Sequence, residues 1–447
     1  MQAFLFLESK IMFSRKDIIV LGMMIFALFL GAGNIIFPPM EGLSAGQHWT
    51  SASLGFVLTG VLMPFITLVV VAILGRGEEL TKDLPKWAGT GFLVILYLTI
   101  GSTFAMPRIT NVAYEMAWLP LGLTENNANV RFVFSLIFNL IAMGFMISPN
   151  TIISSVGKFM TPALLVLLIA VAITVFISPL SEIQAPSNAY ENSHSLLIGL
   201  TSGYQTMDVL AAIAFGGIVA RALSAKNVTK TKDIVKYTIS AGFVSVILLA
   251  SLYFSLFYLG ATSAAVAEGA TNGGQIFSRY VNVLFGSAGT WIMAGIIVLA
   301  SLTTLVGVTS ASADYFSKFS VRFSYPFWAA LFTAMTITVS QYGLTDLLRI
   351  TIPALLLIYP VAIVLVLLQF LRKKLPSIKF TYNSTLLVTV CFSLCDSLNN
   401  VKMLPESINS LLKHFPLSSE GMAWLVPTLV MLVASIFIGK ALHKTHS

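Results

Sequence analysis

The chain has 447 residues, of which 57% are hydrophobic and only 10% are charged, and its mean hydropathy is +0.88. About a quarter of the residues in an ordinary soluble domain are charged, so this composition excludes a soluble protein. It predicts an all-α polytopic membrane protein. No polar stretch is long enough for a separate domain, and we therefore expect residues 1–447 to form a single membrane domain.

Apolar runs of about 20 residues, long enough to cross a bilayer, recur from end to end of the chain. They predict about twelve membrane spans, at residues 18–40, 51–75, 88–118, 131–148, 159–180, 196–221, 237–260, 286–316, 325–341, 345–371, 382–398 and 421–442.

The basic residues predict which ends of these spans face the cytoplasm. With residues 1–17 as a cytoplasmic N-terminus, 20 of the 26 Lys and Arg, Lys158 among them, fall in cytoplasmic segments, as the positive-inside rule describes. We therefore expect both termini in the cytoplasm. The net charge of +8 follows from this topology and does not indicate nucleic-acid binding. Met12 precedes a sequence that resembles a natural cytoplasmic start, so residues 1–11 look dispensable.

The first span is interrupted at its middle by Gly31-Ala32-Gly33-Asn34 and is followed by Pro38 and Pro39. Lipid offers no partner for freed backbone groups, so a broken helix is tolerated only where it is buried in protein or lines a cavity. In transporters such breaks commonly hold the substrate or an ion. The break therefore predicts a protein that moves a small solute across a membrane.

A second polar interruption lies in the sixth span, and it contains Thr201, Ser202, Gly203, Tyr204, Gln205, Thr206 and Asp208. It falls five spans after the first, and because five is odd, the two broken helices cross the membrane in opposite directions. This pattern predicts an inverted repeat with halves at 18–180 and 196–371, followed by two extra helices at 382–442. The alternative is that Gly and Ser merely allow close helix packing.

The chemistry of a broken helix suggests what the first break binds. A half-helix that starts near Gly33 presents unpaired N–H groups and the positive end of its dipole, which suit a carboxylate. Carbonyl groups freed just before it, at Ala27, Phe29 and Leu30, suit a hard cation such as sodium. The surrounding side chains are apolar, so a small zwitterion with an apolar side chain matches the site.

The eighth span carries a dense band of hydroxyl groups, beginning with Ala300-Ser301-Leu302-Thr303-Thr304. Such hydroxyls either bond the carbonyl groups of their own helix or supply ligands to a cation on a neighbouring helix. Both readings stay open from the sequence alone.

At these residues the chain resembles the bacterial branched-chain amino acid:cation symporters. The resemblance rests on Asp17-Ile-Ile-x-Leu-Gly, Phe26-Ala-Leu-Phe-x-Gly-Ala-Gly-Asn-Ile-Ile-Phe-Pro-Pro39, Phe104-Ala-x-Pro-Arg108, Gly203-Tyr-x-Thr-Met-Asp208 and Gly421-x-Ala-Trp-Leu-x-Pro427. It covers nearly the whole chain in order, and the first-span motif is its most specific part.

The resemblance implies import of leucine, isoleucine and valine across a bacterial cell membrane, driven by a sodium or proton gradient. It also implies a five-plus-five inverted repeat of the leucine-transporter-like type, the APC superfamily, with helices 1 and 6 broken. By analogy with that fold, the cation site comprises Ala27, Leu30, Ala300, Thr303 and Thr304. The substrate site is then expected at Gly31, Ala32, Gly33 and Asn34 together with Thr201, Ser202, Gly203 and Tyr204.

Three charged residues near the spans have alternative roles. Asp208 could take a proton, receive the substrate amine, or cap the helix that restarts at Thr206-Met207. Arg108 and Glu115 are seven residues apart, two turns along one helix face, and form either an outer gate pair or an exposed structural ion pair.

The sequence contains neither a phosphate-binding loop nor a His-Glu-x-x-His motif, and no convergent catalytic acids or nucleophile lie at mid-membrane. We therefore expect a protein that is not an enzyme, has no catalytic residues, and needs no transition metal and no cofactor beyond the co-transported Na⁺ or H⁺. Membrane lipid surrounds it, and no obligate protein partner is evident. The alternatives are a carrier for another small neutral amino acid or metabolite, and a channel.

Overall fold

The computed structural model describes residues 14–122, 124–146, 161–187, 190–191, 194–319 and 322–445, and every regular element within these ranges is a helix. The proposed start at Met12, the segment 1–11 and Lys158 lie outside the described residues.

Most of the predicted spans correspond to one helix each. These are α7 (Ala128–Met146), α9 (Thr161–Ile177), α12 (Thr231–Ala261), α15 (Ser287–Phe319), α16 (Tyr325–Val339), α17 (Leu344–Leu371), α18 (Ile378–Asn400) and α20 (Leu425–Thr445). Three short helices lie between them: α13 (Ala264–Ala267), α14 (Gly273–Phe285) and α19 (Glu406–Leu412).

The other predicted spans are runs of consecutive helices. They are α1 (Arg15–Phe29) with α2 (Ala32–Ala45); α3 (Trp49–Val57), η2 (Leu58–Leu62) and α4 (Met63–Leu74); α5 (Lys86–Leu98), η4 (Thr99–Thr103), α6 (Ala105–Val112) and η5 (Ala113–Trp118); and α10 (Ser195–Ser202), η9 (Gly203–Thr206) and α11 (Asp208–Ser224). Of these connecting turns, η2, η4 and η5 are π-helical and η9 is a 3₁₀ turn.

Among the described residues, seven helices are long and apolar enough to cross a membrane, and the α10–α11 pair, bent by 47°, makes an eighth. Two apolar helices, α9 and the first part of α20, are shorter than a full span, and the break leaves α1 and α2 short as well. A count of twelve crossings therefore stays a prediction, because a broken or short helix does not by itself reach across about 30 Å of hydrocarbon.

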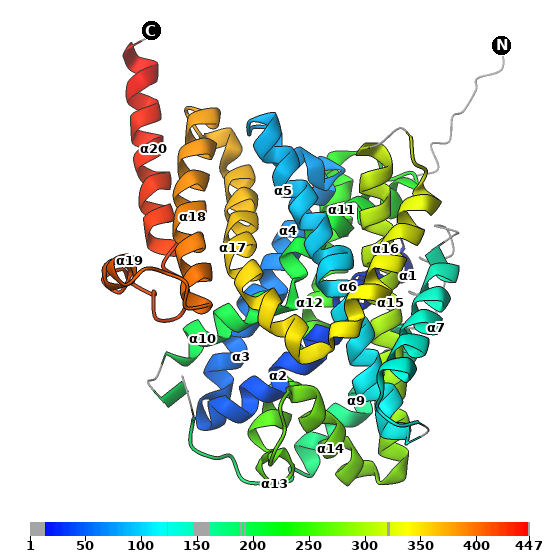
Figure 1. Ribbon diagram of the computed structural model, residues 1–447. Helices are drawn as coiled ribbons and strands as arrows, with labels where there is room; N and C mark the ends of the chain where they lie inside the picture. The colour runs from blue at the N-terminus through cyan, green and yellow to red at the C-terminus, as the bar shows by residue number, and fades with distance from the viewer. Residues whose placement is uncertain are drawn as a thin grey trace, which may run out of the picture.

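Each broken helix packs against a helix from the other half of the chain. Both α1 and α2 pack along α12, whereas α10 packs on α3 and α11 packs on α4. The first helix of each half thus lies on the second helix of the other half, which is what an inverted five-plus-five repeat requires. In Figure 1 the breaks bring dark-blue α2 and green α10 and α12 together in the middle of the molecule.

Glycines allow this packing because the backbones touch. A methyl group added at Gly42 would lie 2.1 Å from the carbonyl oxygen of Phe257 on α12, and one at Gly199 would lie 2.1 Å from the carbonyl oxygen of Ala52 on α3. Small residues at such crossings are how membrane helices approach closely when lipid supplies no hydrophobic driving force.

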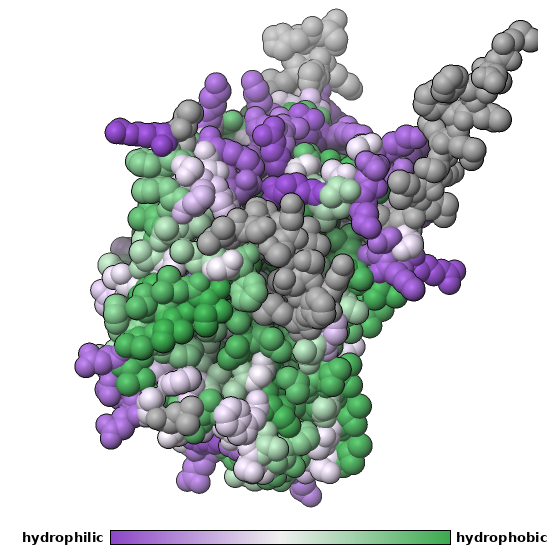
Figure 2. Space-filling view, turned by 90° about the vertical axis from the view of Figure 1, so that its right-hand side faces the viewer, coloured by the Kyte–Doolittle hydropathy of each residue, from purple (hydrophilic) through white to green (hydrophobic). Residues whose placement is uncertain are grey.

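The outer surface agrees with a multi-pass membrane protein. Figure 2 shows a broad apolar band between hydrophilic ends, with the hydrophilic residues most dense at the top, the end at which α17 is followed by α18 in Figure 1. Large apolar side chains are exposed on helices that face outward, such as Ile137 on α7 and Phe437 on α20. The helix α18 packs on α17, and α20 packs on α18, away from the two breaks.

Candidate functional site

The first break is a two-residue interruption between α1 and α2. Leu30 (ψ 79°) leaves the helical conformation and Gly31 is extended (ψ 173°), after which α2 begins at Ala32. Both Leu30 and Asn34 are buried, at 0% and 1% exposure. The Gly31 amide donates to the Asn34 side-chain oxygen (3.2 Å) and to the Phe29 carbonyl (2.7 Å), so the Phe29 carbonyl is not free as the sequence suggested.

The hydroxyl band of α15 lies against this break. The Thr303 hydroxyl lies 3.2 Å from the Ala27 carbonyl oxygen, and the Thr304 hydroxyl donates to the Leu30 carbonyl at 3.1 Å. The Thr303 hydroxyl is also 2.9 Å from the Ala300 carbonyl oxygen. The five residues predicted for a cation site therefore lie at the contact between α1 and α15, and their three carbonyl and two hydroxyl oxygens meet in pairs, two of them across 276 and 274 residues of sequence.

The second break has a different form. A 3₁₀ turn, η9, ends at Thr206, and Met207 has a left-handed conformation (φ 64°) before α11 begins. Asp208 is the first residue of α11 and not its N-cap, which is Met207, so the capping alternative for Asp208 is wrong. Its carboxylate instead accepts from the Asn34 side-chain amide at 2.7 Å.

Asn34 connects three helices. Its side-chain oxygen accepts from Gly31, while its nitrogen donates to Asp208 on α11 and lies in hydrogen-bonding contact with the Tyr253 hydroxyl on α12. A second tyrosine, Tyr359 on α17, accepts from the backbone N–H of Val209 at 3.2 Å. The two breaks are thus joined by buried polar groups and not only by packing.

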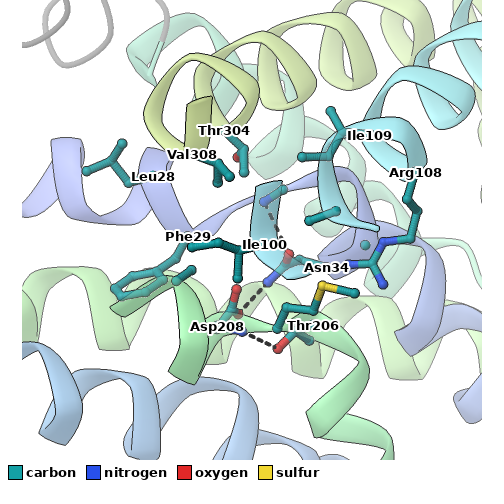
Figure 3. Close-up of a pocket in the computed structure, with 15 residues that line it drawn as sticks. Leu28, Phe29, Asn34, Ile100, Arg108, Ile109, Thr206, Asp208, Thr304 and Val308 are labelled. Carbon is teal, nitrogen blue, oxygen red and sulfur yellow. Dashed lines mark hydrogen bonds between the residues drawn. The ribbon is translucent and has the colours of Figure 1, made fainter. Parts of the chain in front are cut away.

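A small central cavity of about 20 Å³, room for roughly one water molecule, lies between the breaks. Its lining comprises Leu28, Phe29, Gly31, Gly33, Asn34, Ile100, Ala105, Arg108, Ile109, Thr206, Met207, Asp208, Ala211, Thr304 and Val308. Figure 3 shows side chains from α1, α6, α11 and α15 pointing toward one another around it. Most of the lining is apolar, with a few polar groups on α2, α6, α11 and α15.

Four predicted substrate residues do not reach the central cavity. Thr201, Ser202 and Tyr204 line a different, larger space of about 280 Å³, called here the α10 cavity. It lies between α10 and η9, α17 and the chain that precedes α20. The Ser202 hydroxyl bonds Glu41 on α2, and Tyr204 stacks on Tyr359 with 4.6 Å between ring centres.

The fourth of these residues, Gly203, packs against the second span. A methyl group there would lie 2.1 Å from the Thr59 hydroxyl. The side chains of this break that line the central cavity follow it in sequence, at Thr206, Met207 and Asp208.

The predicted Arg108–Glu115 pair is not formed. Arg108 is 3% exposed and donates from Nη1 to the Gln205 carbonyl at 2.9 Å, with its guanidinium 5.4 Å from the Phe37 ring centre. Glu115 accepts from the Leu344 amide at 3.2 Å. The prediction assumed regular α-helix, but Glu115 lies in the π-helical turn η5, where seven residues no longer make two turns.

Several residues at the site carried no signal in the sequence. Tyr253 and Tyr359 lie within long apolar spans, and their hydroxyls become visible as site groups only when α12 and α17 pack against the breaks. Gln205 contributes its backbone carbonyl to Arg108 while its side chain lines the α10 cavity. A buried Tyr in a span is common, so its position alone would not have indicated a role.

Residues 14–442 match the family described as branched-chain amino acid transport protein. The chain is 99% identical over 436 residues to the branched-chain amino acid permease BrnQ of Haemophilus influenzae, which covers 98% of this chain and 100% of the relative. It is 35% identical over 427 residues to the permease of the same name from Escherichia coli strain K12, covering 95% of this chain and 96% of that one.

Among solved structures, the chain is similar to Mhp1, a nucleobase-cation-symport-1 family transporter in a closed conformation with bromovinylhydantoin bound. The TM-score is 0.62 at 12% identity, over 96% of this chain and 93% of that one. Sequence identity this low carries the fold alone, and that fold is the leucine-transporter-like one.

Proposed function

Because the chain belongs to the branched-chain amino acid transport protein family, we propose that it imports leucine, isoleucine and valine as a symporter driven by a sodium or proton gradient. The substrate binds at the central cavity, which widens to admit it as the outer and inner ends of the protein open in turn. The N- and C-termini face the cytoplasm, which puts α2 and α10 on the outer side.

The observation that carries the coupling proposal is the set of oxygens at the first break. The Thr303 hydroxyl contacts the Ala27 and Ala300 carbonyls, and the Thr304 hydroxyl contacts the Leu30 carbonyl, where α1 and α15 meet. Hard cations prefer oxygen ligands of this kind, and unwound carbonyls serve them in transporters. A cation there holds α1 to α15 and would favour the state that binds substrate.

The cation and substrate positions are adjacent, which supports reciprocal coupling. Thr304 and Gly31 line the central cavity while Thr304 also bonds the Leu30 carbonyl. A cation that orders this segment therefore orders the start of α2, where Gly33 and Asn34 line the cavity. By linkage, substrate binding strengthens cation binding by the same factor.

The test is uptake of radiolabelled leucine by the purified protein in proteoliposomes under an imposed inward gradient of sodium or of protons. We expect one of the two gradients to drive accumulation above the external concentration, and unlabelled isoleucine and valine to compete. Equilibration without accumulation under both gradients would overturn symport and indicate a channel or uniporter. Competition by other neutral solutes but not by isoleucine and valine would overturn the substrate assignment.

A further inference from the structure

Of the fifteen residues around the central cavity, two carry charge, and they approach it from opposite sides. Arg108 comes from α6 and Asp208 from α11, and each is 3% exposed. In Figure 3 Asn34 lies between the two side chains. The cavity therefore presents one buried cation and one buried anion within an otherwise neutral wall.

The two charges do not neutralise each other directly. None of the ion pairs within 4.0 Å between described residues joins Arg108 to Asp208. Asp208 bonds the neutral amide of Asn34, and Arg108 bonds a backbone carbonyl. A buried charge that has only neutral partners is costly, and a ligand with the opposite charge in the right place offsets that cost.

Arg108 also has donor capacity that the protein does not use. Its Nε has no hydrogen-bond partner. Its Nη2 lies beside α2, where a methyl group added at Gly33 would be 2.8 Å away. The guanidinium and the N-terminal amides of α2 thus present positive charge at one end of the cavity, and an arginine fork matches the two oxygens of a carboxylate.

We propose that Arg108 binds the α-carboxylate of the transported amino acid and that Asp208 binds its α-ammonium group. This assignment rests on the proposed function and names the two residues that select a zwitterion. The side chain of the substrate then lies on the apolar wall formed by Leu28, Phe29, Ile100, Ile109 and Val308.

Selection follows from what happens when one group of the ligand is missing. Leucinamide keeps the ammonium but lacks the carboxylate, so it leaves Arg108 without a charged partner. The oxo acid 4-methyl-2-oxopentanoate keeps the carboxylate but lacks the ammonium, so it leaves Asp208 without one. Each analogue is expected to bind the unmodified protein on the order of 100-fold more weakly than leucine.

The experiment measures affinity by ligand-induced shifts of melting temperature in the purified protein, which requires no gradient. In Arg108→Gln, the affinity for leucine should fall about 100-fold, while the affinity for leucinamide should change less than about threefold. The ratio of the two affinities should therefore fall toward unity. In Asp208→Asn, the ratio of the affinity for leucine to the affinity for the oxo acid should fall toward unity in the same way. If either variant binds leucine and the analogue more weakly by the same factor, the substituted residue has a structural role and its assignment to the ligand is wrong.

Two matched variants serve as controls. Arg131 on α7 also donates to a backbone carbonyl (Gln341, 3.2 Å) and lies 5.7 Å from a tyrosine ring centre, but it does not line the cavity. Asp396 on α18 is 3% exposed, like Asp208, and lies outside it. Arg131→Gln and Asp396→Asn should keep both affinity ratios at their original values, and a collapse in either would contradict the proposal.

If Arg108→Gln does not fold, Arg108→Lys keeps the charge and loses only the fork. In this variant the ratio of leucine affinity to leucinamide affinity should lie between that of the unmodified protein and unity. An unchanged affinity ratio would overturn the role of Arg108. The outcome is distinguishable from that of the transport test. If the unmodified protein accumulates leucine but the affinity ratios of the variants are unchanged, only the zwitterion assignment is rejected. If the affinity ratios fall toward unity but no leucine accumulates, only symport is rejected.

Discussion

The two broken helices look alike in sequence but differ in what they expose. The first break is a short gap at Leu30 and Gly31 whose freed carbonyls meet α15 and whose next turn faces the central cavity. The second break is a 3₁₀ turn followed by a left-handed residue, Met207, and most of its polar side chains line the α10 cavity.

The difference shows that polarity within a span indicates where a helix is interrupted, but not which way the interrupted segment faces. At the second break only the end of the segment, from Thr206 to Asp208, reaches the central cavity. The preceding residues join α10 to α2, as the bond between Ser202 and Glu41 illustrates. We therefore expect substitutions at the first break to change the affinity for leucine. Substitutions early in the second break should change the stability of the fold or leave the protein unaffected.

The largest effect is expected at Asn34. Asn34→Ala removes one of the two acceptors of the Gly31 amide and the amide donor to Asp208, and the loss of a hydrogen bond to a buried charge costs about 1.5–3 kcal/mol. Leucine affinity should fall on the order of 100-fold. The control is Asn139→Ala, since Asn139 on α7 is 2% exposed and bonds Thr110 and Ser135, away from the cavity. Equal losses in the two variants would show that Asn34 is no more than a packing residue.

Two glycines test the comparison directly. Gly203→Ala brings a methyl group 2.1 Å from the Thr59 hydroxyl and 3.0 Å from a backbone carbonyl, and such overpacking costs about 1–3 kcal/mol. The melting temperature should fall. In Gly33→Ala the nearest atom is the end of the Arg108 side chain, which can move, so the fold should survive while leucine affinity drops. A reversed pattern, with Gly33→Ala unstable and Gly203→Ala impaired only in binding, would invert our assignment of the two breaks.

A smaller change is expected in cation dependence. Thr304→Ala removes one oxygen from the set around the first break, and we expect the cation concentration for half-maximal leucine uptake to rise about tenfold. Thr309→Ala provides the control, because the Thr309 hydroxyl bonds the Leu305 carbonyl of its own helix at 2.7 Å. An unchanged cation dependence in Thr304→Ala would remove this residue from the site.

The smallest effect is expected at Thr201. Its hydroxyl bonds a carbonyl of its own helix, that of Ile198 at 3.0 Å, and its side chain lines the α10 cavity. Thr201→Ala should leave the leucine concentration for half-maximal uptake within about twofold, since such self-satisfied hydroxyls contribute little to other contacts. A tenfold increase in that concentration would mean that the substrate reaches α10, contrary to the position of the central cavity.

The sequence by itself determined the membrane class, the positions of both breaks and the family. Apolar runs and mid-span Gly and Asn residues are local properties, and a bilayer leaves a chain few ways to satisfy its backbone. The hydroxyls at Thr303 and Thr304 were also predicted correctly as neighbours of Ala27 and Leu30, through resemblance to a known fold.

Only the tertiary structure decided which side chains face the central cavity. Arg108 was assigned to Glu115 by spacing along a regular helix, and a π-helical turn broke that spacing. Asn34 meets Asp208 and Tyr253 across 174 and 219 residues of chain, so their contact depends on how α2, α11 and α12 cross. The direction in which a buried polar group points is set by packing between distant helices, which local sequence patterns do not encode.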